Sequence, residues 1–289
     1  LKSYWKLLKE VNPDVVLTYT IKPNIYGGIC CRMQKVPYIV NITGLGSTFE
    51  RGGLLKKMVV TMYRMALKKA ACVFFQNDRN KQIFEENGIF GLKSKRVNGS
   101  GVNLEKFNME EYPGREKPKF LFVGRLMKEK GIEEYLYCAK KYANRAEFDI
   151  IGYCEEAYED EVKELQKEGI LNFYGFQSDV KAFYRECDAL IIASYHEGMS
   201  NVLLEAAACG RPVLATNIPG CNEAVEDNMT GLLFSSRDKG ALESAIEYFL
   251  SLSPERRKAM GQAARVKMEQ EFDRRIVVES YIDEIEKII

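Results

Sequence analysis

Short runs of β-branched and aromatic residues alternate with longer helical patterns along nearly the whole chain. In the N-terminal third the apolar runs are VVLTYT (15–20), VPYIVNIT (36–43) and ACVFFQN (71–77). A second series follows, with helical patterns such as 132–142 and 179–187 between its runs: KFLFVGR, AEFDIIGY, LNFYGF, DALIIAS, RPVLAT and TGLLF. Near-continuous apolar strands separated by helices are typical of parallel sheets covered on both faces. The pattern therefore predicts two doubly wound α/β domains.

A polar stretch interrupts this pattern near the middle of the chain. The segment NMEEYPGREKPK (108–119) combines proline, glycine and dense charge, as linkers do. We therefore expect an N-terminal domain at residues 1–108, a linker at 109–119 and a second domain at 120–270. A C-terminal helix is expected at 271–289, with the first domain as a candidate packing partner. The length of 289 residues also favours two domains.

The composition is that of a globular protein, with 46% apolar and 29% charged residues. A formal net charge of +1 gives the whole chain no attraction to nucleic acid, so no such partner is expected. The eight cysteines form no C-x-x-C pair, and the single histidine, His196, has no cysteine cluster beside it, so no metal site is predicted. The cysteine usage and the absence of a recognisable signal peptide lead us to expect a cytoplasmic protein.

Two glutamates follow the strand DALIIAS. Ligands of such sheets bind beyond the carboxyl ends of the strands, and Glu197 comes directly after this one. A helix is predicted to begin at Ser200 or Asn201, with Glu205 just over one turn into it. Two carboxylates and the backbone N–H groups of residues 198–201 suit a polyhydroxyl ligand. The alternative is that both glutamates are ordinary solvated charges.

A basic pair follows the strand KFLFVGR. In GRLMKEKG, Gly124 and Arg125 end the strand, and Lys130 precedes the next helix. Arg125 and Lys130 can reach one anion, for which a diphosphate is the obvious candidate, and the helix start favours negative charge. The alternative is a solvated charged turn. The segment matches neither the P-loop nor the G-x-G-x-x-G fingerprint.

Together these residues resemble the retaining glycosyltransferases of family 4. The family carries G-R-x-x-x-x-K-G, which stands here as Gly124-Arg125 to Lys130-Gly131. It also carries E-G-x-x-x-x-x-x-E, which spans Glu197 to Glu205. The phrases EGMSNVLLEAAACGRPVLATNIPG and RVNGSGVNLEKF match the family as well. The resemblance covers nearly the whole chain and implies the GT-B fold, in which two Rossmann-like domains face a cleft.

The resemblance implies how the donor diphosphate is handled. Arg125 and Lys130 would bind it and stabilise the negative charge that develops when the glycosidic bond breaks. The sequence has no Asp-x-Asp motif, which agrees with a family that works without a metal or other cofactor. Retention is attributed there to attack on the same face within an ion pair, with the leaving phosphate accepting the proton of the acceptor hydroxyl.

The resemblance also implies how the rest of the donor nucleotide sugar is held. Glu205 would accept hydrogen bonds from the ribose hydroxyls, and Glu197 would contact the donor sugar. The backbone amides of Met199, Ser200 and Asn201 would hold the donor sugar as well. Gly175 and Phe176 would lie beside the base. Gly124 and Gly198 complete the set of expected donor-binding residues.

Two departures from the family concern the first domain. Many members have a histidine near the sugar, and Thr43, followed by Gly44, stands at that place in NITGLGSTFE. His196 is not an evident replacement, because it lies in the other domain. Members also usually begin with further strands and a glycine-rich loop, so we expect a first domain that is truncated at its N-terminus and has an unpaired sheet edge.

The segment TYTIKPNIYGG (18–28), with NITGLG after it, resembles a narrower bacterial subgroup. Its members add N-acetylhexosamine-type sugars to saccharides linked to undecaprenyl diphosphate, for capsule, O-antigen or protein glycans. The resemblance implies a UDP-sugar donor and a lipid-linked saccharide acceptor. Lys22, Asn24, Thr43 and Gly44 are then candidates for the acceptor side, and the alternative for the first two is a loop turned by Pro23.

A lipid-linked acceptor requires contact with a membrane. The segment Leu54 to Ala70, LLKKMVVTMYRMALKKA, has apolar residues at helical spacing and basic residues without an acid. Such a basic amphipathic helix can lie on an anionic membrane surface, so peripheral attachment to the inner face of the membrane is one expectation. The alternative is an ordinary helix that packs on the sheet.

The sequence thus predicts a retaining, metal-independent transferase that moves an N-acetylhexosamine from a UDP-sugar to a lipid-linked saccharide. Two alternatives remain open. The chain could bind nucleotide sugars without turnover, or it could be a glycosidase with Glu197 and Glu205 as the acid and nucleophile pair.

Overall fold

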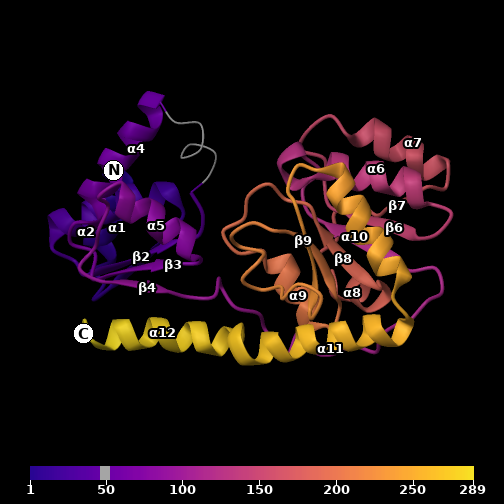
Figure 1. The fold of residues 1–289 in the computed structure, drawn as a ribbon. Coiled ribbons are helices and arrows are strands. Elements are labelled where there is room, and N and C mark those ends of the chain that lie inside the picture. Colours follow the sequence, from indigo (N-terminus) through magenta and orange to yellow (C-terminus); the bar gives the residue numbers. More distant parts are fainter. Residues whose placement is uncertain (46–52) are drawn as a thin grey trace. The chain divides into compact units, whose positions relative to one another are not determined.

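The computed structural model describes residues 1–45 and 53–289 and divides into two compact units (Figure 1). The first unit contains residues 1–100 and 275–289, and the second contains residues 101–274. The predicted linker at 109–119 lies inside the second unit, because the division falls after Ser100. The C-terminal residues 275–289 belong to the first unit.

The first unit is built on a four-stranded sheet in the order β1-β2-β3-β4, and all its strands are parallel. The strands are β1 (Val16–Tyr19), β2 (Tyr38–Ile42), β3 (Cys72–Phe75) and β4 (Ser94–Arg96). The helices are α1 (Lys2–Val11), the π-helical turn η1 (Pro23–Gly27), α2 (Gly28–Gln34), α4 (Gly53–Leu67), α5 (Asp78–Glu86) and α12 (Arg274–Glu286). Three of the strands match the predicted apolar runs, whereas β4 has a polar sequence that gave no strand signal.

Alternate residues of each strand in the first unit face opposite layers. On β2, Val40 and Ile42 pack with the residues of α1, α2 and α4, whereas Ile39 packs with Val277 of α12 on the other face. Both faces are therefore apolar, which explains why the strands read as continuous hydrophobic runs rather than alternating ones. Helix α12 is separated from this sheet by the whole second unit in the sequence but covers one of its faces (Figure 1).

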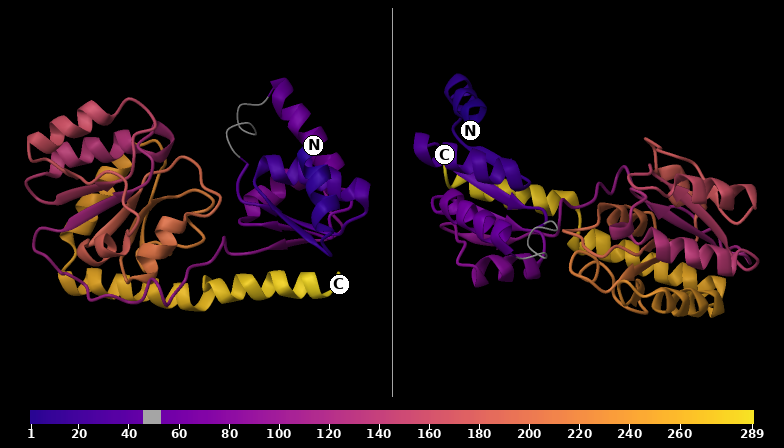
Figure 2. Two further views of the ribbon diagram at one scale, coloured as in Figure 1. Left: turned by 180° about the vertical axis from the view of Figure 1, so that it is seen from behind. Right: turned by 90° about the horizontal axis from the view of Figure 1, so that it is seen from above.

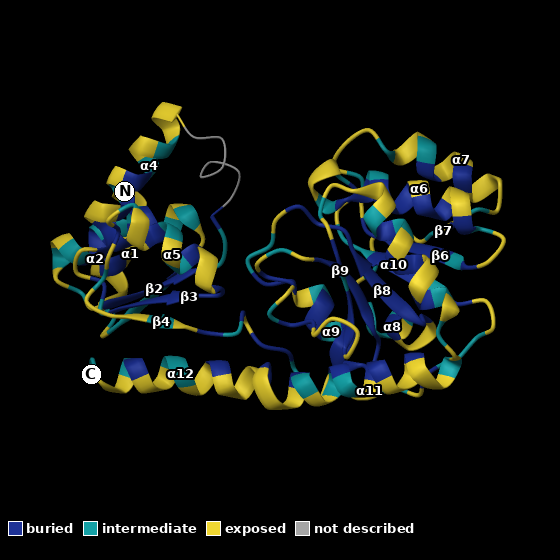
Figure 3. Ribbon diagram, in the orientation of Figure 1, coloured by how far each residue is buried: buried dark blue, intermediate teal, exposed yellow. Residues whose placement is uncertain are grey.

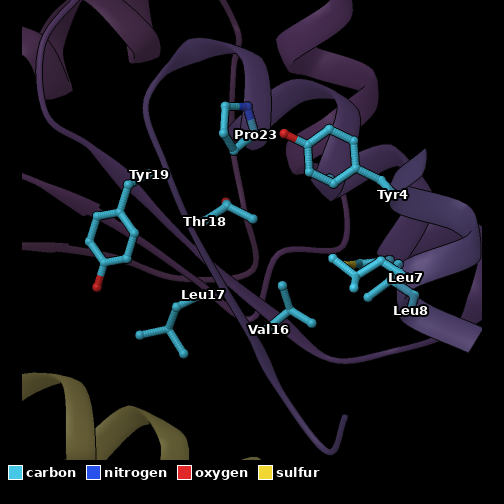
Figure 4. Close-up of a pocket in the computed structure, with 10 residues that line it drawn as sticks. Tyr4, Leu7, Leu8, Val16, Leu17, Thr18, Tyr19 and Pro23 are labelled. Atoms are coloured by element: carbon cyan, nitrogen blue, oxygen red, sulfur yellow. The ribbon is translucent and has the colours of Figure 1, made fainter. Parts of the chain in front are cut away.

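Among the described residues, β1 pairs with β2 alone and so lies at the edge of its sheet. A pocket of about 410 Å³ lies beside it, and its lining is mostly apolar. Figure 4 shows Tyr4, Leu7 and Leu8 of α1 on one side of the pocket and residues 16–19 of β1 on the other.

The second unit contains a six-stranded parallel sheet in the order β10-β9-β8-β5-β6-β7. Its strands are β5 (Lys119–Val123), β6 (Glu147–Ile151), β7 (Asn172–Phe173), β8 (Ala189–Ile192), β9 (Val213–Thr216) and β10 (Gly231–Phe234). Its helices are η2 (Lys128–Lys130), α6 (Ile132–Tyr142), α7 (Glu159–Lys167), α8 (Lys181–Glu186), α9 (Asn201–Ala208), α10 (Lys239–Ser251) and α11 (Pro254–Glu271). The chain winds outward from β5 in one direction and from β8 in the other, which is the doubly wound order.

Helices cover both faces of the six-stranded sheet (Figure 2). On β5, Phe120 and Phe122 pack with α6, α7 and α10, whereas Leu121 packs on the opposite face with α8, α9 and α11. Figure 3 shows the central strands buried between exposed outer helix faces. The strand order reverses between β5 and β8, and ligands of such sheets bind at this switch point.

Helix α4 is the core of the segment predicted to contact a membrane. Its inner face is buried through Val60, Tyr63, Ala66 and Leu67, so it packs on the unit as an ordinary helix does. Its outer face also carries exposed apolar residues, namely Leu54, Leu55, Met58 and Met65. Within residues 1–45 and 53–289, the structure has no helix that is both long and apolar enough to span a bilayer.

Candidate donor site in the second unit

Most of the predicted donor residues follow the two strands at the switch point of the six-stranded sheet, whereas Gly175 and Phe176 follow the edge strand β7. Strand β5 pairs with β8, and the two strands run in parallel. Gly124 and Arg125 follow the carboxyl end of β5, and Ser194 to Glu197 follow the carboxyl end of β8. These two segments therefore leave the sheet side by side, although about 70 residues separate them in the sequence.

The turn after β5 is held against the loop after β8 by a close backbone approach. Gly131 has φ +72°, and a Cβ atom at this position would lie 2.2 Å from the carbonyl oxygen of Ala193. The amide of Tyr195 also donates to the carbonyl of Glu129 at 2.9 Å. Only glycine fits such an approach, so Gly131 positions the turn that carries Lys130.

Lys130 and Glu197 form an ion pair at this junction. Lys130 Nζ donates to Glu197 Oε1 at 2.6 Å, and the Ser194 hydroxyl donates to the same oxygen at 2.8 Å. The side chains of Lys130 and Glu197 are 25% and 14% exposed, so both remain within reach of a ligand while being partly shielded from solvent. Both hydrogen bonds use Oε1 of Glu197, so they leave Oε2 for ligand hydroxyls.

Arg125 is paired with an acid that the sequence reasoning missed. Its Nη1 donates to Glu155 Oε2 at 2.6 Å, and both side chains are over 40% exposed. Glu155 follows β6, the neighbour of β5, so the sheet order brings these residues together. An ion pair this exposed is weak, and a bound diphosphate can compete with Glu155 for the guanidinium.

The loop between β8 and α9 is fixed by a second close approach. The amide of Ser200 donates to the carbonyl of Gly220 at 3.0 Å, so this amide is already engaged in the ligand-free chain. A Cβ atom on Gly220, whose φ is +89°, would lie 2.8 Å from the carbonyl oxygens of Glu197 and Gly198. Met199 and Ser200 are buried, whereas Asn201 at the start of α9 is exposed.

Glu205 is the fifth residue of α9 and is half-buried. Its Oε2 accepts a hydrogen bond from the Tyr184 hydroxyl at 3.0 Å. Burial raises the pKa of Glu205 above its usual value, and the Tyr184 hydrogen bond, with the nearby charges of Lys106 and Arg274, opposes this rise. The carboxylate is thus oriented by a fully buried tyrosine and keeps one oxygen for a ligand.

The glycines at the ends of β5, β6 and β7 form a continuous backbone contact. The amide of Gly152 donates to the carbonyl of Gly175 at 2.9 Å, and a Cβ atom on Gly152 would lie 1.7 Å from the carbonyl oxygen of Gly124. Phe176 follows this contact and is 71% exposed. The resemblance implies that Phe176 lies beside the base, and an exposed aromatic ring at this place can stack on one.

The predicted acceptor-side residues lie in the first unit. Lys22 is exposed, whereas Asn24 is buried in η1, where its Nδ2 donates to the carbonyl of Asn41 at 2.8 Å. Thr43 and Gly44 directly follow β2 and are partly exposed. Asn24 therefore supports the backbone of η1 and β2, and Lys22, Thr43 and Gly44 are the ones that present surface. The rest of the segment NITGLGSTFE, residues 46–50, lies outside the described residues.

Three supporting residues were absent from the sequence prediction: Glu155, Ser194 and Tyr184. Ser194 and Glu155 each follow a predicted strand, so the rule that sites gather at strand ends would have drawn attention to them. Tyr184 lies on α8 and gave no such signal. Among the residues that the structure describes, no three His, Cys, Asp or Glu side chains gather as a metal ligand set would require.

Comparison with solved structures gives the same fold. The UDP complex of HepE from Anabaena aligns with 98% of this chain and 82% of its own at a TM-score of 0.84 and 18% identity. Sucrose-phosphate synthase from Thermosynechococcus elongatus aligns with 98% of this chain and 76% of its own at a TM-score of 0.79 and 20% identity. These similarities confirm the GT-B fold class that the sequence predicts.

Comparison with characterised sequences identifies relatives at modest identity. A Campylobacter jejuni N,N'-diacetylbacillosaminyl-diphospho-undecaprenol α-1,3-N-acetylgalactosaminyltransferase is 26% identical, covering 100% of this chain and 82% of its own. An Escherichia coli UDP-Gal:α-D-GlcNAc-diphosphoundecaprenol α-1,3-galactosyltransferase is 26% identical, covering 85% of this chain and 68% of its own.

Two family patterns match the chain, one in each unit. The pattern described as glycosyl transferase 4-like matches residues 1–77. The pattern described as glycosyl transferases group 1 matches residues 105–267, which include all the predicted donor residues. Because this second match spans more than half of the chain, the protein belongs to the group 1 glycosyl transferases and is a glycosyltransferase of the GT-B fold.

Proposed function

We propose that this glycosyltransferase transfers an N-acetylhexosamine from a UDP-sugar to a saccharide linked to undecaprenyl diphosphate, with retention of anomeric configuration. The observation that carries the donor half is the placement of Arg125, Lys130, Glu197 and Glu205 at the switch point of the six-stranded sheet. Two cations suit a diphosphate and two carboxylates suit the hydroxyls of two sugars.

The two cations stabilise the leaving group. When the donor C–O bond is cleaved, negative charge develops on the leaving diphosphate, and Lys130 and Arg125, which hold the bound diphosphate, stabilise that charge. In the ligand-free chain each cation is neutralised by a carboxylate. The incoming diphosphate replaces Glu155 at Arg125 and shares Lys130 with Glu197.

The two glutamates orient the nucleotide sugar. Glu205 is held by Tyr184, and its remaining lone pairs accept the ribose hydroxyls. Glu197 is held by Ser194 and Lys130 and accepts hydrogen bonds from hydroxyls of the donor sugar. In this arrangement neither carboxylate acts as a nucleophile, and the departing phosphate oxygen accepts the proton of the acceptor hydroxyl.

The acceptor assignment is supported by the relatives and by the first unit. Two relatives act on diphospho-undecaprenol saccharides according to their names, and one of them transfers N-acetylgalactosamine. The exposed residues Leu54, Leu55 and Met58 on α4, with basic neighbours such as Lys57, fit attachment to an anionic membrane surface. Capsule or O-antigen synthesis on the cytoplasmic side of the membrane is the corresponding setting.

The test is a transfer assay with the full chain. UDP-GalNAc, UDP-GlcNAc, UDP-Gal and GDP-mannose are each incubated with undecaprenyl-diphospho-saccharide acceptors, and products are identified by mass, with the anomeric configuration read by NMR. We expect transfer from a UDP-N-acetylhexosamine with an α linkage from the α donor. Transfer from UDP-Gal alone would overturn the assignment of an N-acetylhexosamine as the donor sugar. A β-linked product would overturn the assignment of retention.

Titration with UDP separates binding from turnover. If UDP binds but no donor and acceptor pair gives product, the chain is a nucleotide-sugar-binding protein and the transfer proposal fails. Free sugar released from a glycoside without UDP as a product would instead identify a glycosidase.

A further inference from the structure

A basic pocket lies on the first unit at the amino end of β2. It has a volume of about 560 Å³, within the range of about 300–1,000 Å³ that is usual for small-molecule sites. Four cations and three uncharged residues line it: Arg32, Lys35, Lys68, Lys69, Val36, Pro37 and Tyr38. In a parallel sheet this end is opposite to the carboxyl ends, where Thr43 and Gly44 follow β2, so the pocket is separate from the predicted acceptor residues.

The charge of the basic pocket is uncompensated. No acid is among its lining residues. Within the part of the chain that the structure describes, neither Arg32 nor any of the three lysines forms an ion pair with a carboxylate. Four like charges around one pocket repel one another, and an anion inside it would relieve that repulsion.

Hydrogen bonds hold together the backbone that frames the basic pocket. Arg32 Nη1 donates to the carbonyl of Met65 at 2.5 Å, which ties α2 to the last turn of α4. The Tyr38 hydroxyl donates to the carbonyl of Ala66 at 2.5 Å, and the amide of Val36 donates to the carbonyl of Cys31 at 3.0 Å. The cations are thus attached to a floor that is already in place before a ligand arrives, which lowers the entropic cost of binding.

Helix ends explain only part of this arrangement. Basic residues near a helix C-terminus interact favourably with the helix macrodipole. Arg32 of α2 does this at the C-terminus of α4, through the carbonyl of Met65. That interaction requires neither a concave pocket nor an apolar floor between the cations. Val36, Pro37 and the Tyr38 ring provide such a floor, which suits the carbon skeleton of an anionic ligand.

We propose that the basic pocket binds the phosphate group of an organic phosphate ester. A phosphate monoester carries about −1.5 to −2 charges at pH 7 and accepts several hydrogen bonds, and arginine with lysines is the preferred protein environment for it. The ester is either a soluble metabolite or the headgroup of an anionic lipid, and the exposed side chains of Met33 and Met65 lie on the helices that border the pocket. The proposal concerns the first unit alone and does not depend on the donor site.

The chain offers a matched pair of variants for the test. Lys68→Gln/Lys69→Gln removes two charges from the basic pocket, and Lys2→Gln/Lys6→Gln removes two exposed charges from α1, outside the pocket. The probes are glycerol 3-phosphate, followed by calorimetry, and vesicles of phosphatidylcholine with or without phosphatidic acid, followed by sedimentation. Equal melting temperatures of the variants and the wild-type chain show that each variant is folded.

We expect the pocket variant to bind the phosphate ester at least about tenfold more weakly than the wild-type chain, since two charge-assisted hydrogen bonds are lost. The control variant retains its affinity for glycerol 3-phosphate. Binding to glycerol 3-phosphate identifies a soluble ester as sufficient, whereas binding only to phosphatidic acid vesicles, with the larger loss in the pocket variant, identifies a lipid. Absence of binding to both probes, or equal losses in the two variants, or no loss in the pocket variant, would overturn the proposal.

Discussion

Lys130 Nζ lies 2.6 Å from Oε1 of Glu197, across the switch point of the six-stranded sheet. Lys130 lies in the short helix η2 after β5, Glu197 lies in the loop after β8, and the Gly131 backbone contact with Ala193 brings them together. In the ligand-free chain each neutralises the other, so neither charge is left uncompensated in a partly buried position. On donor binding the lysine gains the diphosphate as a second partner, which is the basis of the first prediction.

Lys130→Ala should lower kcat about 100-fold, because one positioned cation is lost at the leaving group. Lys128→Ala is the matched control. Lys128 belongs to the same short helix, but its Nζ is exposed and pairs with Glu133 at 3.4 Å. Steady-state kinetics with the preferred UDP-sugar measure both variants. Similar losses in the two would mean that the turn acts through its overall charge and that Lys130 has no specific role.

Affinity for UDP should depend on pH through Glu205. Burial raises the pKa of this carboxyl, and only the carboxylate accepts two hydrogen bonds from ribose. Binding should therefore weaken as the pH falls through the raised pKa, and Glu205→Gln should give a weaker and flatter profile. Calorimetric titration of UDP between pH 7 and pH 5 measures this.

Tyr184→Phe provides the second arm of that experiment. The Tyr184 hydroxyl lowers the pKa of Glu205 by its hydrogen bond, so its removal should raise that pKa further. The pH at which UDP affinity declines should then move upward. An unchanged profile in Tyr184→Phe would show that another group controls the pH dependence.

Glu155→Gln should strengthen UDP binding by about twofold to fivefold. Glu155 competes with the diphosphate for Arg125, and exposed ion pairs of this kind are worth up to about 1 kcal/mol. The comparison is with Glu156→Gln, whose carboxylate instead accepts from the Lys128 amide at 2.8 Å. Weaker UDP binding by Glu155→Gln would mean that this carboxylate orients Arg125 for the donor.

Gly131→Ala should destabilise the second unit far more than Gly169→Ala. The two glycines have φ values of +72° and +73°, so both alanines carry the left-handed strain of about 1–2 kcal/mol. Only at Gly131 does the new Cβ atom collide with backbone, at 2.2 Å from the Ala193 oxygen, whereas nothing lies within 4 Å at Gly169. Urea denaturation measures the difference. Equal free energies of unfolding would show that the Gly131 contact relaxes at no cost.

Stability of the first unit should decline in acid through Glu284. Burial would raise the pKa of this α12 carboxyl, but hydrogen bonds from Lys93, Lys95 and Lys287 outweigh it and lower the pKa from 4.5 to about 2. Because the folded-state pKa is the lower one, the stabilisation is present above pH 4.5 and is lost as the pH falls toward 2.

Glu284→Gln should therefore be less stable at pH 7 and should lose less stability on acidification. Urea midpoints at several values between pH 7 and pH 3 measure this, with Glu286→Gln as the control on the same helix. Parallel pH profiles for Glu284→Gln and the wild-type chain would contradict the assignment.

Much of the fold could be predicted from the sequence because its strands are buried on both faces. A strand such as β8, with four buried residues in a row, gives a continuous apolar signal, and helix α6 begins and ends where its pattern predicts. The strand β4 could not be predicted, since Ser94–Arg96 contains no apolar residue. It is a strand because its backbone pairs with β3, which is a property of the neighbour and not of its own residues.

For the donor site, the sequence by itself determined that Arg125 and Glu197 follow strand ends, that Lys130 precedes the next helix and that Glu205 lies in the first turns of another. Tertiary structure decided their partners, because Glu155, Ser194 and Tyr184 meet them through the order of strands and the packing of helices. It also decided that the division falls after Ser100 and that residues 275–289 join the first unit. Local periodicity reports which face of an element is buried, whereas pairing between distant segments depends on contacts that no local pattern contains.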